Sequence, residues 1–292
     1  MLNLESARYL AHRLLRGRKI YASISGGKDS VAMGLYLKEL EIPFERVFAD
    51  TGWEHPALYE HLRGPVTAAL GPITEVRGAL DFVELVRKKG MFPSRVKRFC
   101  TEELKVLPIQ RFLLEVSETE EIVNAVGIRR AESLARSQMA EWEWSDSWDC
   151  EIWRPLVLWT KEDVLAIHQR HNVPLAPLYS WGAGRVGCFP CIHSAKREIA
   201  MVGRVAPERI DLIEALEREL NERGAARDRE LQREYAPRSM FSYHGGDNVH
   251  HPINIREAVA WANSKRGEWQ PPGAGDGCMR FGLCEATDQA EE

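Results

Sequence analysis

The chain lacks long apolar runs and has no strong excess of either charge. Its 292 residues are 44% hydrophobic and 28% charged, and the formal net charge is −4. No apolar run approaches the roughly 20 residues that cross a membrane, and the N-terminus lacks the profile of a signal peptide. We therefore expect a cytoplasmic protein with no membrane partner, and the charge excludes a chain that binds polyanions over its whole surface.

Cysteine is scarce, with six residues, and in a cytoplasmic chain this usage is more typical of metal sites or catalytic thiols than of disulfides. Cys188 and Cys191 have the two-residue spacing that chelates metal. We expect Cys278 and Cys284 to complete the site, because the Gly/Pro-rich segment before them would gain order by tethering. Four thiolates suit zinc and a 4Fe–4S cluster equally. We exclude Cys150, since both of its neighbours are acidic. Three histidines are more typical of a loop than of a metal site: His244, His250 and His251.

A Gly-rich turn lies between an expected strand, 19–24, and an expected helix, 29–40. The N–H groups of such a turn and the dipole of the helix both favour an anion, and glycines let phosphate approach the backbone closely. A lysine adds positive charge and two serines add hydroxyl donors. The turn therefore predicts a phosphate site that does not follow the Walker spacing. Its residues are Ser25, Gly26, Gly27, Lys28, Asp29 and Ser30.

Strands and helices alternate over residues 1–200, which predicts an α/β fold with a doubly wound, mostly parallel sheet. Residues 201–292 predict a smaller helical region that packs back through its cysteines. Within that region we expect helices over 207–234 and 254–264, and a loop over 243–251. In the first region we expect strands over 19–24, 46–49, 73–76 and 121–126, and helices over 3–16, 29–40, 56–70, 80–89 and 101–116. Thr160 is expected to cap a further helix.

Two other polar segments follow expected strands. Asp50 and Thr51 come directly after the strand 46–49, and Gly127, Arg129 and Arg130 follow the strand 121–126. Parallel strands present their carboxyl ends at one edge, so these residues should share a crevice with the Gly-rich turn. A carboxylate there can hold Mg²⁺, and arginine forks bind phosphate oxygens.

Cys100 stands at an expected helix start, near Arg98 and Lys105. A helix N-terminus and neighbouring cations lower the pKa of a thiol. We therefore interpret Cys100 as a reactive thiol close to the nucleotide.

Together these segments resemble the phosphoadenosine phosphosulfate reductase superfamily over roughly residues 18–200. The Gly-rich turn is similar to the PP-loop, Ser-Gly-Gly-x-Asp-Ser, of ATP pyrophosphatases and adenine-nucleotide alpha hydrolases. The likeness continues through Trp153-Arg154-Pro155-Leu156, Pro177-Leu178-Tyr179 and Gly187-Cys188-Phe189-Pro190-Cys191. It implies an adenine nucleotide alpha hydrolase-like fold.

Within the superfamily, the motifs look most like the ATP pyrophosphatases of DNA phosphorothioation. Thr101 stands where the cluster-bearing sulfonucleotide reductases have the second cysteine of a pair, and their C-terminal Glu-Cys-Gly-x-His is absent from the sequence. The resemblance implies an enzyme that cleaves ATP between the α- and β-phosphates, with Mg²⁺ and an iron–sulfur cluster, and leaves adenylate on a substrate. It further implies a sulfur-donor protein and leaves the acceptor open: a nucleic acid, contacted through local basic clusters, or a small sulfur compound.

These assignments give each residue an expected role. The serines and glycines of the turn cradle pyrophosphate, and Lys28 neutralises the charge that develops as it leaves. Asp29 and Asp50 are candidate metal ligands. Arg129 and Arg130 clamp phosphate, beside Thr51 and Gly127 in the nucleotide site. The expected cluster ligands are Cys188, Cys191, Cys278 and Cys284, with Cys100 as the reactive thiol.

Three alternatives remain at this point. By likeness to the reductases, Cys100 is itself a cluster ligand and one C-terminal cysteine is catalytic. The chain is a sulfonucleotide reductase that releases sulfite from phosphoadenosine phosphosulfate or adenosine phosphosulfate. Or it is a non-catalytic module of a larger assembly, which senses nucleotide and carries an iron–sulfur cluster or zinc for structure.

Overall fold

A six-stranded sheet lies at the centre of the computed structural model, which describes residues 4–232, 234–235, 237–244 and 250–264. The strand order is β3-β2-β1-β4-β6-β5. Neighbouring strands pair in parallel throughout, except that β5 runs antiparallel to β6. This confirms the predicted mostly parallel α/β sheet. The strands are β1 (Lys19–Ser23), β2 (Phe44–Asp50), β3 (Thr74–Arg77), β4 (Ile122–Ala125), β5 (Trp142–Ser145) and β6 (Cys150–Trp153).

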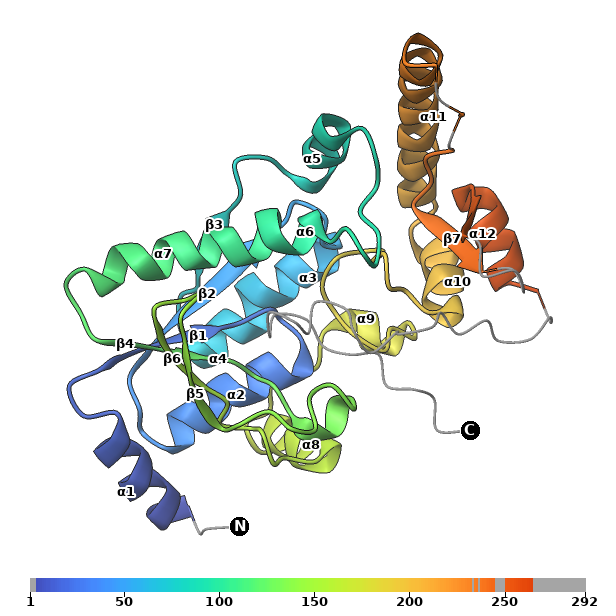
Figure 1. Cartoon of the computed structure of the whole chain (residues 1–292). Helices are drawn as coiled ribbons and strands as arrows, with labels where there is room; N and C mark the ends of the chain where they lie inside the picture. The colour runs from blue at the N-terminus through green and yellow to red at the C-terminus, as the bar shows by residue number, and fades with distance from the viewer. Residues whose placement is uncertain (1–3, 233, 236, 245–249, 265–292) are drawn as a thin grey trace.

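Helices cover both faces of the sheet, as Figure 1 shows. Alternate residues of β1 explain the two layers: Ile20 and Ala22 lie in the core beneath α2, whereas Tyr21 packs in a second cluster with Leu113 of α7. The sheet is therefore doubly wound. On one face lies α7 (Leu107–Ser117), and on the other lie α2 (Lys28–Glu39), α3 (Pro56–His61), α4 (Thr67–Leu70) and α8 (Lys161–Arg170). The predicted cap of α8 is confirmed, because Thr160 and Asp163 form a capping box. Before and between these elements come α1 (Leu4–Leu14), α5 (Phe82–Lys89), α6 (Phe99–Thr101), the single turn η3 (Arg130–Glu132) and α9 (Pro177–Ser180).

Two predicted helices, 56–70 and 101–116, are each interrupted by a π-helical turn. The turn η1 (Leu62–Val66) contains Pro65, and η2 (Glu102–Val106) ends just before Pro108. Proline has no N–H and cannot continue the regular ladder of hydrogen bonds. The N–H groups of Thr67 and Leu107 instead donate to carbonyls five residues back.

No local pattern predicts the strands β5 and β6, and no strand was expected between 126 and 160. Both strands are only four residues long, and β5 lies at the edge of the sheet with Trp144 exposed. What holds the pair is a contact between strands: the rings of Trp142 and Trp153 stack with centroids 5.1 Å apart.

The C-terminal region is mainly helical, as predicted, but it also contains a β-hairpin. The two strands of this hairpin occupy the two ends of the segment expected as a loop over 243–251, and residues 245–249 between them lie outside the described part of the chain. Cys278 and Cys284 also lie outside the described residues. The elements are α10 (Lys196–Val205), α11 (Pro207–Glu230), β7 (Phe241–His244), β8 (His250–Ile253) and α12 (Ile255–Ala262). None of the helices that the structure describes is long and apolar enough to cross a membrane.

A buried carboxylate joins the parts of this region. Glu217, on α11, is 3% exposed and accepts the backbone N–H groups of Met240 at 3.0 Å and Ile255 at 2.9 Å. Burial raises the pKa of Glu217 to about 7, although these two hydrogen bonds act to lower it. The carboxyl group of Glu217 therefore links α11 to the start of β7 and to α12. The free-energy cost of burying this group grows as it ionises.

The Glu217→Gln variant should reveal this cost. A carboxyl whose pKa in the folded state exceeds its ordinary value of 4.5 stabilises the fold fully below pH 4.5 and loses that contribution as the pH rises through 7. Relative to Glu217→Gln, we expect the free energy of unfolding of the wild type to fall by about 3 kcal/mol over that interval. Denaturant unfolding of both proteins at the two ends of the interval measures the change. A difference that does not vary with pH would contradict the assignment.

Candidate nucleotide and thiol site

The predicted phosphate turn, residues 25–30, leads from the carboxyl end of β1 into α2. Gly26 has φ +79°, and a Cβ there would lie 2.6 Å from Cδ1 of Leu58, so this position requires glycine. The hydroxyl of Ser30 donates to the carbonyl of Gly27 at 3.0 Å and accepts the N–H of Ser25 at 3.1 Å. The turn is therefore held in shape by its own serines.

The loop after β4 packs directly against this turn. A Cβ at Gly127 would lie 2.8 Å from the carbonyl oxygen of Asp29, so the two backbones can approach only because residue 127 is glycine. β1 and β4 are neighbours in the sheet, with β2 and β3 on one side and β6 and β5 on the other. The strand order therefore reverses between β1 and β4, and open α/β sheets bind ligands in the crevice at such a topological switch point.

Five charged side chains form a buried cluster behind the turn: Lys28, Asp29, Arg129, Glu132 and Arg136. Asp29 pairs with Lys28 at 3.1 Å and with Arg129. Glu132 accepts the backbone N–H of Arg129 at 2.7 Å and pairs with Arg136. Three cations thus face two carboxylates, and the excess positive charge favours a phosphate ligand.

The neighbouring cations lower the pKa values of the two carboxylates, whereas burial raises them. Burial raises the pKa of Asp29, but Lys28 and Arg129 outweigh it and hold the pKa below its ordinary value. For Glu132 burial prevails over Arg136, and its pKa is raised. Asp29 is therefore the firmly ionised member of the cluster.

Two residues from the later part of the chain fix Lys28. The hydroxyl of Tyr179 accepts the backbone N–H of Lys28 at 3.1 Å, and its ring lies under the ammonium group, 5.5 Å from Nζ. The Nε2 atom of His168 lies 2.8 Å from the carbonyl oxygen of Lys28. The segment Pro177-Leu178-Tyr179 thus contributes to the phosphate turn.

Asp50 lies at the carboxyl end of β2, where three groups already surround it. Its carboxylate accepts the N–H of Gly52 at 2.9 Å and the hydroxyl of Tyr59 at 2.6 Å, and it pairs with Arg77. Mg²⁺ at this carboxylate would have to displace some of these partners. The predicted metal role of Asp50 stays a prediction.

Two other predicted nucleotide residues face elsewhere. The hydroxyl of Thr51 donates to Glu54 at 2.8 Å and lies 3.9 Å from Sγ of Cys188. Arg130 is exposed and donates to the carbonyl of Met139 at 2.8 Å. Thr51 therefore belongs to the surroundings of the thiols, and Arg130 lies outside the buried cluster.

One pocket connects the phosphate turn with the Cys-x-x-Cys loop. It encloses about 900 Å³ of empty space, including its open mouth. Apolar residues of β2 and of the loop after β4 form part of its wall, and charged residues lie near the thiols. Its lining includes Ser25, Ser30, Phe48, Gly127, Ile128, Glu54, Lys105, Arg136, Arg185, Cys188 and Cys191.

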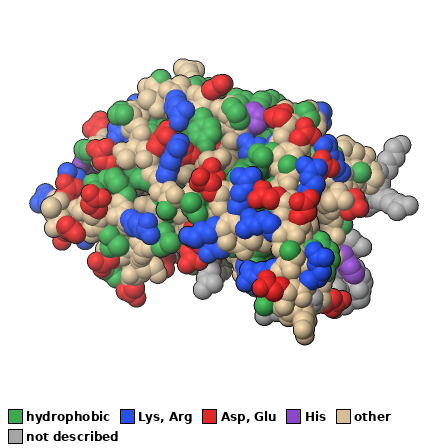
Figure 2. All heavy atoms as spheres, turned by 90° about the horizontal axis from the view of Figure 1, so that it is seen from above, with side chains coloured by type: hydrophobic (Ala, Val, Ile, Leu, Met, Phe, Trp, Pro, Cys, Tyr) green, Lys and Arg blue, Asp and Glu red, His purple; other side chains and the backbone are tan. Residues whose placement is uncertain are grey.

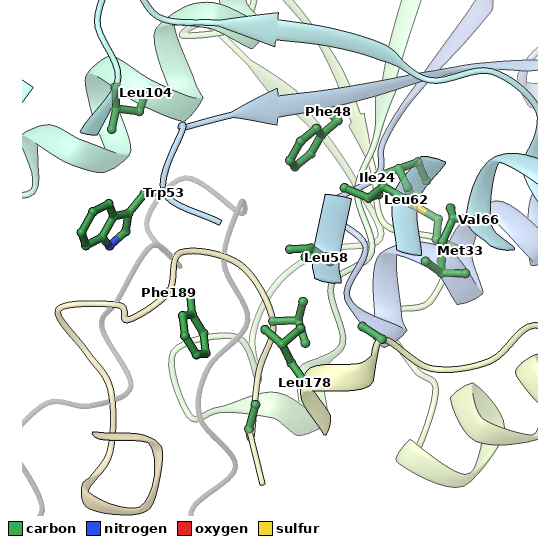
Figure 3. Packing of buried hydrophobic residues seen from close by; sticks show 14 of the residues in the cluster. Ile24, Met33, Phe48, Trp53, Leu58, Leu62, Val66, Leu104, Leu178 and Phe189 are labelled. Atoms are coloured by element: carbon green, nitrogen blue, oxygen red, sulfur yellow. The ribbon is translucent and has the colours of Figure 1, made fainter. Parts of the chain in front are cut away.

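A hydrogen-bonded pair of loops holds the Cys-x-x-Cys segment against the end of β2. The N–H of Phe189 donates to the carbonyl of Trp53 at 2.9 Å, and the indole N–H of Trp53 donates to the carbonyl of Pro190 at 2.9 Å. Trp53 also stacks on Phe82, with ring centroids 4.4 Å apart. Figure 3 shows Trp53 and Phe189 within the hydrophobic core. The position of Cys188 is therefore coupled to the sheet.

Cys100 lies with Cys188 and Cys191, on the wall of a second, smaller cavity. Burial raises the pKa of the Cys100 thiol to about 12, and the other two thiols add to the rise, whereas Lys105 acts to lower it. The structure thus differs from the lowered pKa that we expected from the helix start and the nearby cations. The reason is that Cys100 is buried beside two further thiols.

His193 lines the same small cavity, and the sequence analysis missed it. Its side chain is 3% exposed, and neither ring nitrogen has a hydrogen-bond partner among the described residues. Burial lowers the pKa of His193 to about 3, and Arg185, Arg95 and Arg98 lower it further. The one feature of the sequence that could have indicated a role for His193 at the thiols is its position two residues after Cys191.

The three thiols in one cavity fit a group that thiolates bind. Among the residues that the structure describes, no three His, Cys, Asp or Glu side chains stand close enough to hold a single metal ion. An iron–sulfur cluster is wider than one ion, so its ligands need not converge on a point.

Known proteins resemble this chain over its sheet region. Residues 19–194 match the phosphoadenosine phosphosulfate reductase domain. An uncharacterized 37.8 kDa protein of Escherichia phage 186 is 32% identical over 246 residues, which cover 67% of this chain and 73% of that protein. An adenosine 5'-phosphosulfate reductase of Burkholderia cepacia is 30% identical over 101 residues, which cover 35% of this chain and only 38% of the reductase.

A solved structure has the same fold. The phosphoadenylyl-sulfate reductase of Candida auris, in a phosphate complex, superposes with a TM-score of 0.50 and 21% sequence identity. The superposition covers 65% of this chain and 90% of that reductase. The intact turn 25–30, the thiols and the matched residues 19–194 agree with one another, and the chain belongs to the phosphoadenosine phosphosulfate reductase domain family.

Proposed function

We propose that the chain binds ATP with Mg²⁺ and cleaves it between the α- and β-phosphates, leaving adenylate on a substrate and releasing pyrophosphate. The observation that carries the proposal is the complete phosphate turn, residues 25–30, backed by a buried cluster with more cations than carboxylates. Three linked phosphates are the polyanion that such a turn suits best.

In the proposed reaction, a nucleophile of the substrate attacks the α-phosphorus and the bond to the bridging oxygen of the β-phosphate breaks. Negative charge then develops on the departing pyrophosphate. The N–H groups of Gly26 and Gly27 and the hydroxyl of Ser25 hold that group, while Lys28 neutralises its charge. Asp29 is a positioning residue, because it holds Lys28 and Arg129 beside the turn before any ligand binds. Bound Mg²⁺ would add positive charge at the phosphates.

The apolar part of the pocket suits the adenine ring. Phe48 of β2 and Val126 and Ile128 after β4 line the pocket close to the turn. A flat heteroaromatic base gains from contact with such a wall, as small-molecule pockets usually combine an apolar lining with a few polar groups.

The thiols support a second component, an iron–sulfur cluster with zinc as the alternative. Cys188 and Cys191 are its firmest ligands, and the closeness of Cys100 supports the set that includes Cys100. Cys278 and Cys284 stay candidates outside the described residues. A cluster here would supply electron transfer at the far end of the pocket from the phosphate turn. We propose sulfur transfer to the adenylated substrate, with a sulfur-donor protein as partner.

The acceptor is a nucleic acid or a small sulfur compound. Figure 2 shows Lys and Arg side chains gathered on the face seen from above, with acidic side chains among them. Two of the basic side chains of α5 already pair with acids, Arg87 with Glu219 at 2.9 Å and Lys89 with Glu103 at 2.5 Å. This mixed charge favours the small acceptor over a long nucleic-acid track.

A sulfonucleotide reductase is the second candidate function. The cavity shared by Cys100, Cys188 and Cys191 favours it, and so does the likeness to proteins named adenosine 5'-phosphosulfate reductase. Sulfite release from either sulfonucleotide, without ATP turnover, would establish it. A non-catalytic nucleotide-binding module would bind ATP and release neither pyrophosphate nor sulfite.

The Lys28→Ala variant tests the proposed cleavage. Loss of a preorganised cation at the leaving group should lower the rate of pyrophosphate release by about 10²–10³-fold. The matched control is Lys38→Ala, an exposed lysine on the same helix, which should keep the wild-type rate. Pyrophosphate release from ATP at the wild-type rate in Lys28→Ala would reject the assignment.

Single Cys→Ser variants test the ligand set. Because Cys100 shares a cavity with the Cys-x-x-Cys pair, we expect Cys100→Ser, Cys188→Ser and Cys191→Ser each to lose most of the iron and the broad visible absorbance. Cys278→Ser and Cys284→Ser should keep both. Cys150→Ala is the control, since Cys150 packs in the core beneath α7. Loss of iron in the two C-terminal variants but not in Cys100→Ser would restore the ligand set expected from the sequence.

A further inference from the structure

We propose that His193 is the fourth ligand of an iron–sulfur cluster held by Cys100, Cys188 and Cys191, an inference that rests on the proposed thiol-bound cluster. The described residues bring three thiols to one cavity, and a cluster with four irons takes four protein ligands. The position after Cys100 carries threonine, whose hydroxyl is a poor ligand for iron. One ligand position is therefore left for another side chain.

The position of His193 fits that place. Residues 191–194 form a tight turn, in which the N–H of Ser194 donates to the carbonyl of Cys191 at 2.9 Å. The hydroxyl of Ser194 in turn accepts the N–H of Cys191 at 3.1 Å. This turn fixes His193 two residues after a cysteine ligand, on the wall of the cavity that holds all three thiols.

The ring of His193 has no other task in the described structure. It is 97% buried, since its exposed fraction is 3%, and both ring nitrogens lack a hydrogen-bond partner there. Burial of a polar ring without partners is costly, so such a group in a native fold calls for a ligand or an ion. An iron atom at one nitrogen supplies the missing partner.

The charges around the cavity agree with a bound anionic cluster. Lys105 faces the thiols, and Arg95, Arg98 and Arg185 act on His193. Three thiolates give the cluster a net negative charge in this buried place, which the surrounding cations offset.

The nearby carboxylate is a weaker rival for the fourth position. Glu54 also lies near the thiols, but its carboxylate already accepts the hydroxyls of Thr51 at 2.8 Å and Tyr59 at 3.1 Å. The C-terminal cysteines are the remaining rivals, and the experiment below distinguishes them from His193.

Pulsed EPR of the full-length protein tests the proposal directly. The cluster is reconstituted anaerobically and reduced, in protein made with either natural or ¹⁵N-labelled histidine. We expect a strongly coupled histidine nitrogen in the wild type. The variant His193→Cys should retain the iron content, lose that nitrogen coupling and show a lower reduction potential, because thiolate replaces imidazole at iron. The control His61→Gln removes another buried histidine with an unpartnered ring nitrogen and should leave the coupling unchanged.

Each outcome decides the matter. A nitrogen coupling that disappears in His193→Cys supports the proposal, and loss of iron in His193→Ala with retention in His193→Cys supports it further. A full cluster without coupled nitrogen in the wild type overturns the role of His193 and leaves the proposed cluster standing, with a C-terminal cysteine as the fourth ligand. Wild-type protein that takes up no iron, or only zinc, overturns the iron–sulfur cluster itself.

Discussion

The ion pair between Asp29 and Arg129 is the contact on which the arrangement of the site depends. It joins the first turn of α2 to the loop after β4, and both side chains are almost completely buried. Removal of one partner from such a pair leaves an uncompensated buried charge and typically costs about 3–5 kcal/mol. The same carboxylate also holds Lys28, so the two cations that we assign to the phosphates are positioned by one acid.

The nucleotide half and the thiol half of the site are built in different ways. Around residues 25–30, backbone contact and buried charge determine the geometry, and Gly26 and Gly127 allow the close approach. Around Cys188, the hydrogen bonds of Trp53 attach an irregular loop to the end of β2. Because β2 pairs with β1, a movement of the thiol loop would be transmitted to the strand that precedes the phosphate turn.

Local sequence determined those parts of the fold and site in which neighbouring residues act together. The phosphate turn, the capping box of Thr160 and the alternation of strands and helices are of this kind, and they led to the correct fold. The short strands β5 and β6 depend on contact between Trp142 and Trp153, which no local pattern reveals. The raised pKa of Cys100 likewise follows from burial beside residues nearly ninety positions away, whereas the sequence displays only its basic neighbours. His193 escaped notice because its lack of partners is visible only in three dimensions.

The π-helical turn η2 sets the angle around the helix axis between the side chains of Cys100 and Lys105. In a regular α-helix, five residues rotate by about 500°, which would leave the side chain of Lys105 about 140° around the axis from that of Cys100. The wider turn, in which the N–H of Leu107 reaches the carbonyl of Glu102, reduces that rotation and keeps the lysine facing the thiols. In a regular α-helix, a lysine four positions after the cysteine would lie only about 40° from it around the axis. The π-helical turn therefore accommodates one additional residue between Cys100 and Lys105 while the ammonium group stays on the side of the thiols.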